Sequence, residues 1–333
     1  MGGPRLLSRA RVAFIASSDS TFIRRDLDML SSMFRVRRVR WDGLHKIPSM
    51  ASKILRSDVA FSWFALDHAY VACRLAHLIG RKSAVVVGGI DAAKVPDLGY
   101  GVHLDKRKSR YSAYALAHSD RVLLVDESLR AEIAKNTGLE RKEFVTVPLG
   151  FDAERFRPGT GLRSTVLTVG FVSSTNLRRK GMDTFARAAA NLPDLQFVIV
   201  GAGEDRATQS LRSITAPNIT ILPITDEAGL LREYQRARVY AQLSLYEGLP
   251  SALGEAMACG CVPVGTRVAG IPSLIGDTGY FVPPGDAEAA ETAIRQAFEA
   301  GDGGRARERI AREFSVEKRR EALRRTIEEL AYG

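Results

Sequence analysis

The sequence predicts an α/β fold of two domains, each built on a parallel sheet, that face a central cleft. Three observations support this prediction. The chain has 333 residues, which is long for a single hydrophobic core. Short apolar runs alternate with segments of helical periodicity, the order typical of parallel sheets covered by helices. The alternation stops at a segment containing Pro and Gly, residues 151–161, and then restarts.

The first half contains the elements of one sheet. Its apolar runs are short and rich in Val, Ile and aromatic residues, and residues 83–87 form a continuous apolar run of the buried parallel type. The expected strands are 11–16, 36–41, 58–64, 83–87, 121–125 and 144–147. The expected helices are one that carries Phe22 to Met33, then 67–79, 106–117 and 127–136.

The second half repeats the pattern. The expected strands are 165–171, 196–200, 219–222, 239–243, 261–264 and 280–282, and residues 172–180 are expected to form a loop. The expected helices are 181–191, 227–236, one that begins near Ser251, 287–300 and a charged amphipathic helix at 316–330. We therefore expect an N-terminal domain at 1–155, a C-terminal domain at 156–315, and a helix at 316–333 that packs back toward the N-terminal domain.

The excess positive charge is confined to the first half. Residues 1–158 contain 27 Lys and Arg against 17 Asp and Glu, a net charge of +10, whereas residues 159–333 contain 21 of each. The densest part is R-V-R-R-V-R at 35–40. Such a field favours an anionic substrate or an anionic membrane surface, although solvated surface arginines would give the same count. We expect no nucleic-acid partner.

Composition and cysteine spacing exclude several classes. No apolar run approaches the roughly 20 residues that a membrane-spanning helix needs, and residues 1–11 lack the long apolar core of a secretory signal. Cys73, Cys259 and Cys261 form neither a metal-type nor a disulfide pattern. We expect a cytoplasmic protein, free or associated with the cytoplasmic face of a membrane, without a bound metal.

The clearest chemical pattern is Y-E-G-L-P-S-A-L-G-E-A-M-A-C-G-C at 246–261. Ser251 is expected to cap a helix that ends at Gly260. Glu247 lies in the loop before this helix and Glu255 about one turn inside it. A helix N-terminus with glycine at its mouth binds anions, and two neighbouring carboxylates suit a ligand with hydroxyls on both sides of a phosphate, such as a sugar nucleotide. An ordinary capped helix with two solvated glutamates is the alternative.

Polar or glycine-containing loops follow many of the expected strands. Ligands of parallel sheets bind at the carboxyl ends of the strands, so loops of both domains are expected to line one cleft. These loops are 17–20, 88–91, 172–180, 201–203 and 244–251.

Six segments, in order along the chain, carry a family resemblance. They are H-S-D-R-V-L-L-V-D-E-S-L-R (118–130), F-V-T-V-P-L-G-F-D-A-E-R-F-R-P (144–158), V-L-T-V-G-F…R-R-K-G-M-D-T (166–184), F-V-I-V-G-A-G-E-D (197–205), E-G-L-P-S-A-L-G-E-A-M-A-C-G-C-V-P-V (247–264) and G-I-P-S-L-I-G-D-T-G-Y-F-V-P-P-G-D (270–286). The set resembles the retaining GT-B glycosyltransferases of family 4, the glycogen-synthase-like group. The resemblance covers about residues 118–300 and reaches the first hundred residues only through architecture.

The resemblance implies two Rossmann-like domains, with the acceptor bound by 1–155 and the nucleotide sugar by 156–315. It implies that Lys180, with Arg179 or Arg178 beside it, contacts the diphosphate. Glu247 would hold a hydroxyl of the donor sugar near the reacting carbon, and Glu255 would bind the ribose hydroxyls. The remaining donor-side residues are Gly248, Leu249, Pro250 and Ser251 at the phosphate, and Gly201, Gly203 and Pro223 near the nucleotide.

Two positions depart from the family pattern. Phe171 stands where the family often has Arg, which leaves open whether Arg178 or Arg179 supplies that cation. Gly88-Gly89-Ile90-Asp91 stands where the family often has a His, so Asp91 becomes the acceptor-side candidate, with a turn aspartate as the alternative. Gly201 and Gly203 fit a tight turn better than a dinucleotide fingerprint, because the third glycine is absent.

Together these observations predict a retaining glycosyltransferase that moves a sugar from a nucleoside-diphosphate donor, UDP- or GDP-linked, to a hydroxyl acceptor without a metal. The acceptor would be a glycan, a glycolipid or a small molecule, and it would be anionic or lie at an anionic surface. A nucleotide-sugar epimerase on the same fold and a non-catalytic sugar-nucleotide-binding protein are the alternatives.

Overall fold

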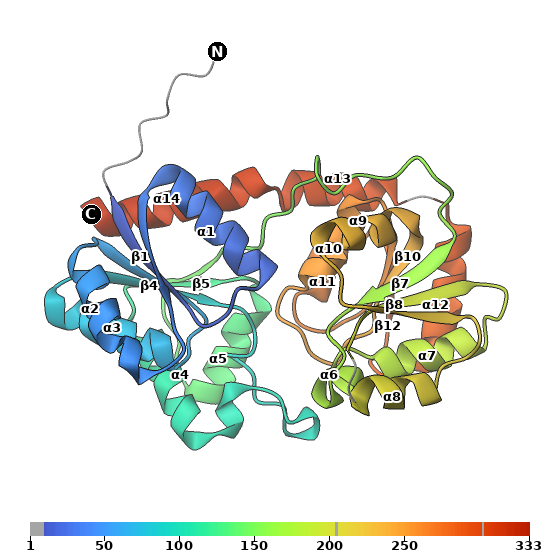
Figure 1. The fold of residues 1–333 in the computed structure, drawn as a ribbon, viewed down its shortest axis with the longest axis horizontal. Helices are drawn as coiled ribbons and strands as arrows, with labels where there is room; N and C mark the ends of the chain where they lie inside the picture. Colours follow the sequence, from blue (N-terminus) through green and yellow to red (C-terminus); the bar gives the residue numbers. More distant parts are fainter. Residues whose placement is uncertain (1–9, 204–205, 302) are drawn as a thin grey trace, which may run out of the picture. The chain divides into compact units, whose positions relative to one another are not determined.

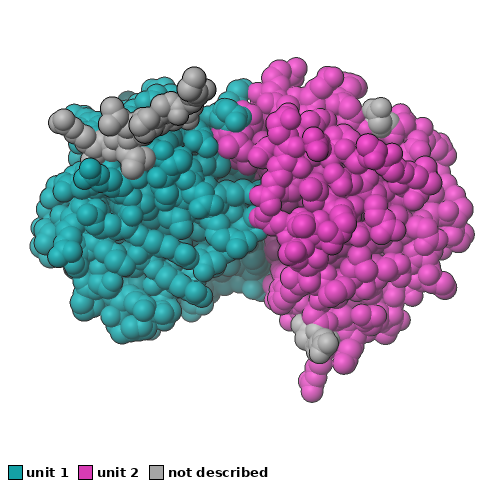
Figure 2. Space-filling view, turned by 45° about the horizontal axis from the view of Figure 1, so that its top comes forward, with its two compact units in different colours: residues 1–149, 317–333 teal, residues 150–316 magenta. Residues whose placement is uncertain are grey.

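The computed structural model describes residues 10–203, 206–301 and 303–333 (Figure 1). The chain forms two compact units, which Figure 2 distinguishes by colour: residues 1–149 with 317–333, and residues 150–316. From the sequence we expected the domain boundaries between residues 155 and 156 and between residues 315 and 316. The segment that follows residue 149 packs within the second unit, since the Phe151 N–H donates to the Phe314 carbonyl and the Phe151 ring fills the space beside Gly254.

The first unit is a six-stranded parallel sheet in the order β2-β1-β3-β4-β5-β6. Its strands are β1 (Arg11–Ala16), β2 (Arg35–Arg40), β3 (Val59–Trp63), β4 (Lys82–Val87), β5 (Arg121–Leu124) and β6 (Phe144–Thr146). Its helices are α1 (Thr21–Met33), α2 (Ile47–Leu55), α3 (Asp67–Ile79), α4 (Lys106–His118) and α5 (Ser128–Thr137), with most of α14 (Val316–Tyr332).

Alternation along the strands of this unit builds a core on each face of the sheet. On one face, Ala13 and Ala60 pack with Met50 and Ile54 of α2. On the other, Phe14 stacks on Phe61 with ring centroids 5.6 Å apart. Because both faces are buried, the central strands read as continuous apolar runs, which made them recognisable in the sequence.

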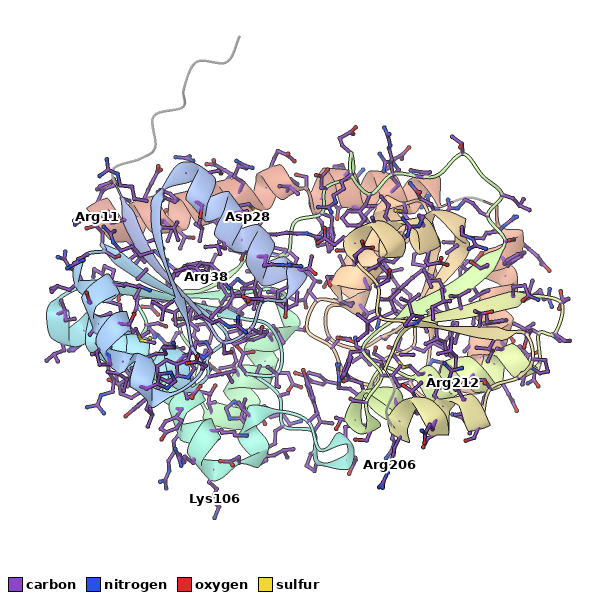
Figure 3. All side chains as sticks on the ribbon, in the orientation of Figure 1. Arg11, Asp28, Arg38, Lys106, Arg206 and Arg212 are labelled. Carbon is purple, nitrogen blue, oxygen red and sulfur yellow. The ribbon has the colours of Figure 1, made fainter. Side chains whose placement is uncertain are left out.

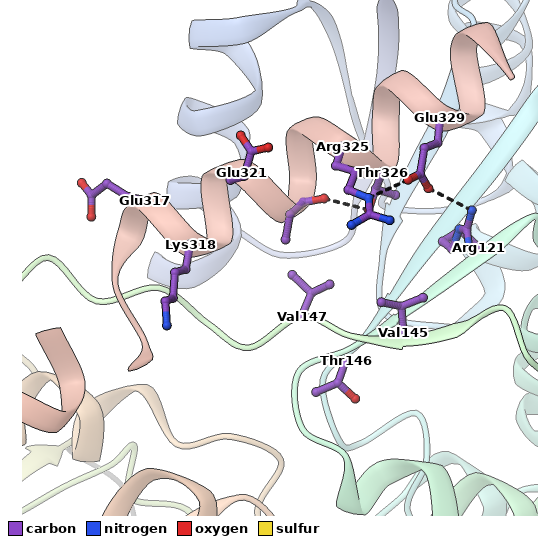
Figure 4. Close-up of a pocket in the computed structure, with 11 residues that line it drawn as sticks. Arg121, Val145, Thr146, Val147, Glu317, Lys318, Glu321, Arg325, Thr326 and Glu329 are labelled. Carbon is purple, nitrogen blue, oxygen red and sulfur yellow. Dashed lines mark hydrogen bonds and ion pairs between the residues drawn. The ribbon is translucent and has the colours of Figure 1, made fainter. Parts of the chain in front are cut away.

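A buried ion pair attaches α14 to the sheet of the first unit. The Arg319 guanidinium donates to both carboxylate oxygens of Asp26 on α1 at 2.6 and 2.5 Å, and to the Val147 and Pro148 carbonyls. The indole of Trp63 donates to the same carboxylate at 2.8 Å. Farther along α14, Glu329 accepts from Arg325 and Arg121 beside a groove of about 620 Å³ between α14 and β6 (Figure 4).

The second unit is also a six-stranded parallel sheet, in the order β12-β11-β10-β7-β8-β9. Its strands are β7 (Thr165–Val169), β8 (Gln196–Ala202), β9 (Ile219–Pro223), β10 (Ala237–Gln242), β11 (Val262–Thr266) and β12 (Tyr280–Val282). Its helices are α6 (Ser174–Arg179), α7 (Met182–Ala190), α8 (Arg206–Ser213), α9 (Glu227–Arg236), α10 (Ser251–Ala258), α11 (Ile271–Ile275), α12 (Ala287–Glu299) and α13 (Gly304–Glu313).

The structure confirms the prediction of two α/β units, each built on a parallel sheet, and corrects several local expectations. Residues 172–180 do not form a plain loop, because they contain α6. The helices α2, α8, α11 and α13 were not predicted. Helix α11 has only five residues, and α8 and α13 contain few large apolar residues. Residues 1–9, where no secretory signal is expected, and Glu204 and Asp205 at the end of the segment 197–205 lie outside the described residues.

No helix in the ranges that the structure describes has both the length and the apolar composition needed to cross a membrane.

Candidate donor site in the second unit

The strand order of the second unit reverses between β7 and β10. These two strands are neighbours in the sheet, yet the chain runs outward from β7 through β8 and β9, and outward from β10 through β11 and β12. The loops that leave their carboxyl ends therefore diverge and open a crevice, the usual ligand position in such sheets. The segment with α6 follows β7, and the segment from Leu243 to Pro250 follows β10.

The helix α6 presents its basic residues at its C-terminal end. Its N-cap Ser173 accepts a hydrogen bond from the Asn176 N–H, Arg178 and Arg179 lie in its last turn, and Lys180 is the C-cap. Lys180 also directly precedes Gly181, the N-cap of α7. Cations are favourable at the C-terminus of α6 and need no anion there, whereas they are unfavourable at the start of α7 unless an anion binds.

Lys180 and Glu247 meet across the crevice. The Lys180 ammonium donates to Glu247 Oε1 at 2.8 Å, although 67 residues separate the two in sequence. The same oxygen accepts from Ser244 Oγ at 3.0 Å and from Gln242 Nε2 at 3.3 Å. The Glu247 side chain is only 10% exposed and that of Lys180 18%. A buried carboxylate is therefore held by one cation and two neutral donors on the end of β10.

The surroundings of Glu247 keep it ionised. Burial acts to raise its pKa, but Lys180 and Arg179 outweigh burial, and the pKa of Glu247 lies below its usual value. Arg179 Nη1 is 3.4 Å from Glu247 Oε2. The loop after β10 thus carries a negative carboxylate at neutral pH, with two cations within 3.4 Å of it.

Arg179 holds the loop that carries Glu247. Its Nη1 donates to the Tyr246 carbonyl at 3.0 Å, and its Nε and Nη2 donate to Asn176 Oδ1 at 3.1 and 2.9 Å. Its backbone carbonyl accepts the Leu245 N–H at 2.7 Å. Arg179 is buried, whereas Arg178 is exposed. These contacts make Arg179 a positioning residue.

The N-terminus of α10 carries no side-chain cap. Pro250 is the N-cap and has no side chain that accepts a hydrogen bond, and Ser251 is the first helical residue. The expectation that Ser251 caps the helix was wrong, because the preceding proline takes that position. The first-turn N–H groups of an uncapped helix need an outside acceptor. The helix ends at Ala258, two residues before the predicted Gly260, which has the left-handed conformation usual after a helix, at φ +74°.

The mouth of α10 is built from buried backbone. Gly248, Leu249 and Pro250 are all buried, and the Gly248 carbonyl accepts the Gly270 N–H at 2.9 Å. This bond ties the segment before α10 to the loop before α11. The mouth of the helix is therefore fixed by contacts on both sides.

Glu255 points into the protein and is held by Tyr234. It is 5% exposed, and the Tyr234 hydroxyl on α9 donates to Glu255 Oε2 at 3.0 Å. Burial and the nearby Glu255 charge raise the pKa of Tyr234 well above its usual value, so this hydroxyl keeps its proton and acts as a donor. The solvated-glutamate alternative is therefore wrong for both Glu247 and Glu255.

Glycines allow the loops of the site to approach one another. Gly201 has φ +126°, and a Cβ there would lie 2.2 Å from the Gly170 carbonyl oxygen. Gly181 has φ +65°, and a Cβ there would lie 2.0 Å from the Leu243 carbonyl oxygen. A Cβ at Gly203 would meet no atom within 4 Å, so glycine is not required sterically at that position. Pro223 ends β9 and is exposed.

Asp91 lies in the first unit and stabilises a turn. Its Oδ1 accepts the N–H groups of Gly88 and Gly89 at 3.0 and 2.9 Å, and its Oδ2 accepts that of Ala65 at 2.8 Å. It is fully buried, and burial raises its pKa to about 6. The geometry favours the turn aspartate that the sequence left as the alternative. A contact between Asp91 and an acceptor stays a prediction that this burial disfavours.

Comparison with known proteins identifies the architecture. The family described as Glycosyl transferases group 1 matches residues 165–300. Sucrose-phosphate synthase from Thermosynechococcus elongatus superposes with a TM-score of 0.78 at 16% identity, covering 97% of this chain and 99% of that one. Anabaena HepE, solved with UDP and glucose, gives a TM-score of 0.79 at 13% identity, covering 96% and 99%. The chain therefore has the GT-B fold of these proteins, and residues 165–300 match the glycosyl transferase family.

Sequence relatives of this GT-B chain are distant. N-acetyl-alpha-D-glucosaminyl L-malate synthase of Bacillus anthracis is 25% identical over 280 residues, covering 78% of this chain and 72% of that protein. A phosphatidylinositol N-acetylglucosaminyltransferase component of Arabidopsis thaliana is 24% identical over 213 residues, covering 61% and 46%. The chain thus spans about half the length of the Arabidopsis relative.

Several residues of the candidate donor site were not predicted from the sequence. Gln242 and Ser244 bond Glu247, Asn176 bonds Arg179, and Tyr234 bonds Glu255. Gln242 and Ser244 carried a usable signal, because they are polar residues at the end of an otherwise apolar strand. Asn176 carried none, because it lies with Arg179 in the unpredicted helix α6. Tyr234 carried none, because its partner Glu255 is 21 positions away in sequence.

Within the described ranges of this GT-B chain, no group of three or more His, Cys, Asp or Glu side chains is arranged to hold a metal ion. Cys73, Cys259 and Cys261 are buried free thiols.

Proposed function

We propose that the chain is a retaining glycosyltransferase that moves a sugar from a nucleoside-diphosphate donor to a hydroxyl acceptor without a metal. The single observation that carries this proposal is the buried, ionised Glu247 at the crevice between β7 and β10. It is held by Lys180 and lies just before the uncapped N-terminus of α10. Such an arrangement offers a negative and a positive group a few ångströms apart, as the two ends of a cleaving glycosidic bond require.

The positive part of the site would hold the diphosphate. Negative charge builds on the leaving phosphate as the bond to the sugar breaks, and Lys180 with the N–H groups at the start of α10 would stabilise it. Lys180 would be shared between Glu247 and the phosphate. Because protein cations supply this charge, we propose that no metal is needed.

The negative part would act on the sugar. Ionised Glu247 would accept a hydrogen bond from a sugar hydroxyl and stabilise the positive charge that develops at the anomeric carbon. In the proposed step the carbon–phosphate oxygen bond breaks, the acceptor oxygen bonds the same face of the carbon, and the leaving diphosphate takes the acceptor proton. Retention is proposed from the family resemblance. Glu255, fixed by Tyr234, would accept hydrogen bonds from the ribose diol.

Solved structures of similar fold support a nucleotide-sugar donor. Anabaena HepE has been solved with UDP and with UDP-glucose, at TM-scores of 0.77 and 0.78. We propose a UDP- or GDP-sugar donor for this chain and an acceptor bound by the first unit. The net +10 of residues 1–158 supports an anionic acceptor, or one presented at the cytoplasmic face of an anionic membrane in envelope biosynthesis.

Two alternatives share the donor site. An epimerase would convert the nucleotide sugar with no acceptor present, and a non-catalytic binding protein would leave it unchanged. The Lys180–Glu247 pair favours transfer over simple binding, since binding alone does not require a buried carboxylate beside the phosphate site. A transferase forms product only when an acceptor is present, an epimerase forms product without an acceptor, and a binding protein forms none.

The proposal is tested in two steps on the full chain. A thermal-shift screen of UDP, GDP and ADP selects the base, because a ligand at a hundred times its dissociation constant stabilises the native state by about 2.7 kcal/mol. The selected sugar donor is then incubated with hydroxyl acceptors in EDTA, and NMR reads the anomeric configuration of the product. Inverted product, or activity abolished by EDTA and restored by a divalent metal, would overturn the mechanism.

A further inference from the structure

A second cluster of cations lies in the first unit, at the open edge of its sheet. A pocket of about 330 Å³ is lined by residues of β2, of the turn after it and of α2, and we call it the β2-edge pocket. Its lining residues are Arg38, Val39, Arg40, Lys46, Ser49 and Lys53. The volume is that of a small-ligand site, and four of its six residues are cations. Figure 3 labels Arg38 on this strand.

The backbone of β2 presents a donor to this pocket. β2 is the outer strand of the sheet. The N–H groups of Arg35 and Trp41 donate to the Ala10 and Ala16 carbonyls beside β1. Since N–H groups alternate in direction along a strand, the Arg40 N–H faces the open edge. The Arg38 carbonyl on this edge already accepts from Lys53 Nζ at 2.7 Å. The edge therefore offers the Arg40 N–H as a donor beside the Lys53 ammonium, which already occupies the Arg38 carbonyl.

The helix α2 adds positive potential to the same place. Lys46 is its N-cap residue and no side chain caps it. Lys46 and Ser49, which stands in its first turn, both line the pocket. A cation at a helix N-terminus is unfavourable in isolation and becomes favourable when an anion binds there.

The local carboxylates do not balance these charges. Asp19 pairs with Arg38 and with Arg40, the latter at 3.4 Å, and Asp42 pairs with Lys46 at 3.5 Å. Four lining cations thus face two carboxylates. Asp19 also keeps the two guanidinium groups side by side on one face of the strand.

We propose that the β2-edge pocket binds a phosphate group, through Arg40, Lys46, Lys53 and the edge N–H of Arg40. Charge-assisted bonds to several donors are the usual chemistry of phosphate recognition. The site belongs to the first unit and is separate in sequence and sheet from the donor site around Glu247. The phosphate would come from a soluble phosphorylated molecule or from the headgroup of an anionic lipid.

Calorimetry on the full chain tests the site with glycerol 3-phosphate as the probe and glycerol as its uncharged match. We expect glycerol 3-phosphate to bind and glycerol not to bind. The double variant Arg40→Gln/Lys53→Met should weaken binding by at least about tenfold, because each removes a charge-assisted hydrogen bond. Absence of binding to both this probe and the anionic vesicles described below would overturn the proposal.

A matched control variant distinguishes specific binding in the pocket from nonspecific attraction to a positively charged surface. Lys106→Met/Arg110→Gln removes the same two charges from exposed positions on α4 of the same unit. It should change the affinity by less than about twofold. Equal losses in the two double variants would mean a diffuse field and would contradict a pocket. Retained binding of UDP by both variants tests the donor site in the second unit independently, and a thermal unfolding curve like that of the wild type shows that the first unit is folded.

Vesicles identify the source of the phosphate. Flotation compares phosphatidylcholine vesicles with and without phosphatidylglycerol, for the wild type and both double variants. A lipid headgroup is indicated when anionic vesicles are bound by the wild type and by the control but not by the pocket variant. A soluble phosphomonoester is indicated when glycerol 3-phosphate binds and the vesicles do not. Either pattern supports phosphate recognition by the pocket.

Discussion

Lys180 donates to Glu247 at 2.8 Å from the end of a six-residue helix, and Glu247 lies on a loop of a different strand. The two strands, β7 and β10, are neighbours in the sheet although 67 positions separate the paired side chains. The contact places a partly buried ammonium group beside a buried carboxylate. Their pairing is the feature on which the proposed chemistry depends.

Replacing Lys180 by Met tests the positive half of this pair. The variant loses a charge-assisted contact to phosphate, so UDP affinity should fall roughly tenfold to a hundredfold in calorimetry. Burial raises the pKa of Glu247 and Lys180 lowers it, so without Lys180 that pKa should rise. The acid limb of the transfer pH profile should therefore move to higher pH. Arg212→Met, on an exposed position of α8, is the control and should change neither; an unchanged UDP affinity in Lys180→Met would contradict the phosphate role.

Glu255 should determine how strongly the site prefers ribose to deoxyribose. A carboxylate held by Tyr234 at 3.0 Å is fixed for hydrogen bonds from a diol. We expect the wild type to prefer UDP over 2′-deoxy-UDP, and Glu255→Gln to bind UDP about tenfold more weakly and to lose most of that preference. Competition calorimetry measures both ligands. If Glu255→Gln still preferred UDP over 2′-deoxy-UDP, other residues would have to bind the ribose hydroxyls.

Gly201 and Gly203 provide a matched pair for the loop beside β7. Gly201→Ala would place a methyl group 2.2 Å from the Gly170 carbonyl at φ +126°, so the free energy of unfolding should fall by more than about 1 kcal/mol. Gly203→Ala meets no atom within 4 Å and should stay within about 0.5 kcal/mol of the wild type. Chemical denaturation compares them. Equal stabilities would show that the close approach is not required.

The Asp26–Arg319 pair should contribute strongly to the stability of the first unit. Arg319→Met leaves a fully buried carboxylate with Trp63 as its remaining donor, and such a loss costs about 3–5 kcal/mol. The exposed neighbour Lys318→Met should cost under about 1 kcal/mol. Thermal unfolding of both variants tests this. Similar melting temperatures would mean that solvent reaches Asp26.

The sequence predicted the order of the strands along the chain and the charged residues of the candidate donor site. Helix 67–79 and strands 11–16 and 280–282 have the predicted bounds, because an apolar run bounded by polar residues or glycine fixes both ends. The paired glutamates were found from their loop-and-helix setting. Their burial was not, since it depends on partners such as Tyr234 that only folding brings near.

The misreadings have physical reasons. Residues 172–180 have no apolar periodicity, so the short helix α6, which ends just before Lys180, was not predicted. Asp91 stands after an apolar strand, which suits a ligand contact and a turn equally, and only its three backbone donors distinguish them. Proline before Ser251 moved the helix start by one residue.

The most direct test of the account is Glu247→Gln, measured for transfer rate and for UDP affinity in one preparation. The substitution keeps the shape of the side chain and removes the charge proposed to act on the sugar. The account predicts a loss of transfer of at least about a hundredfold, with UDP affinity retained or increased because Lys180 is released toward phosphate. Transfer at a rate near that of the wild type, with UDP still bound, would contradict it.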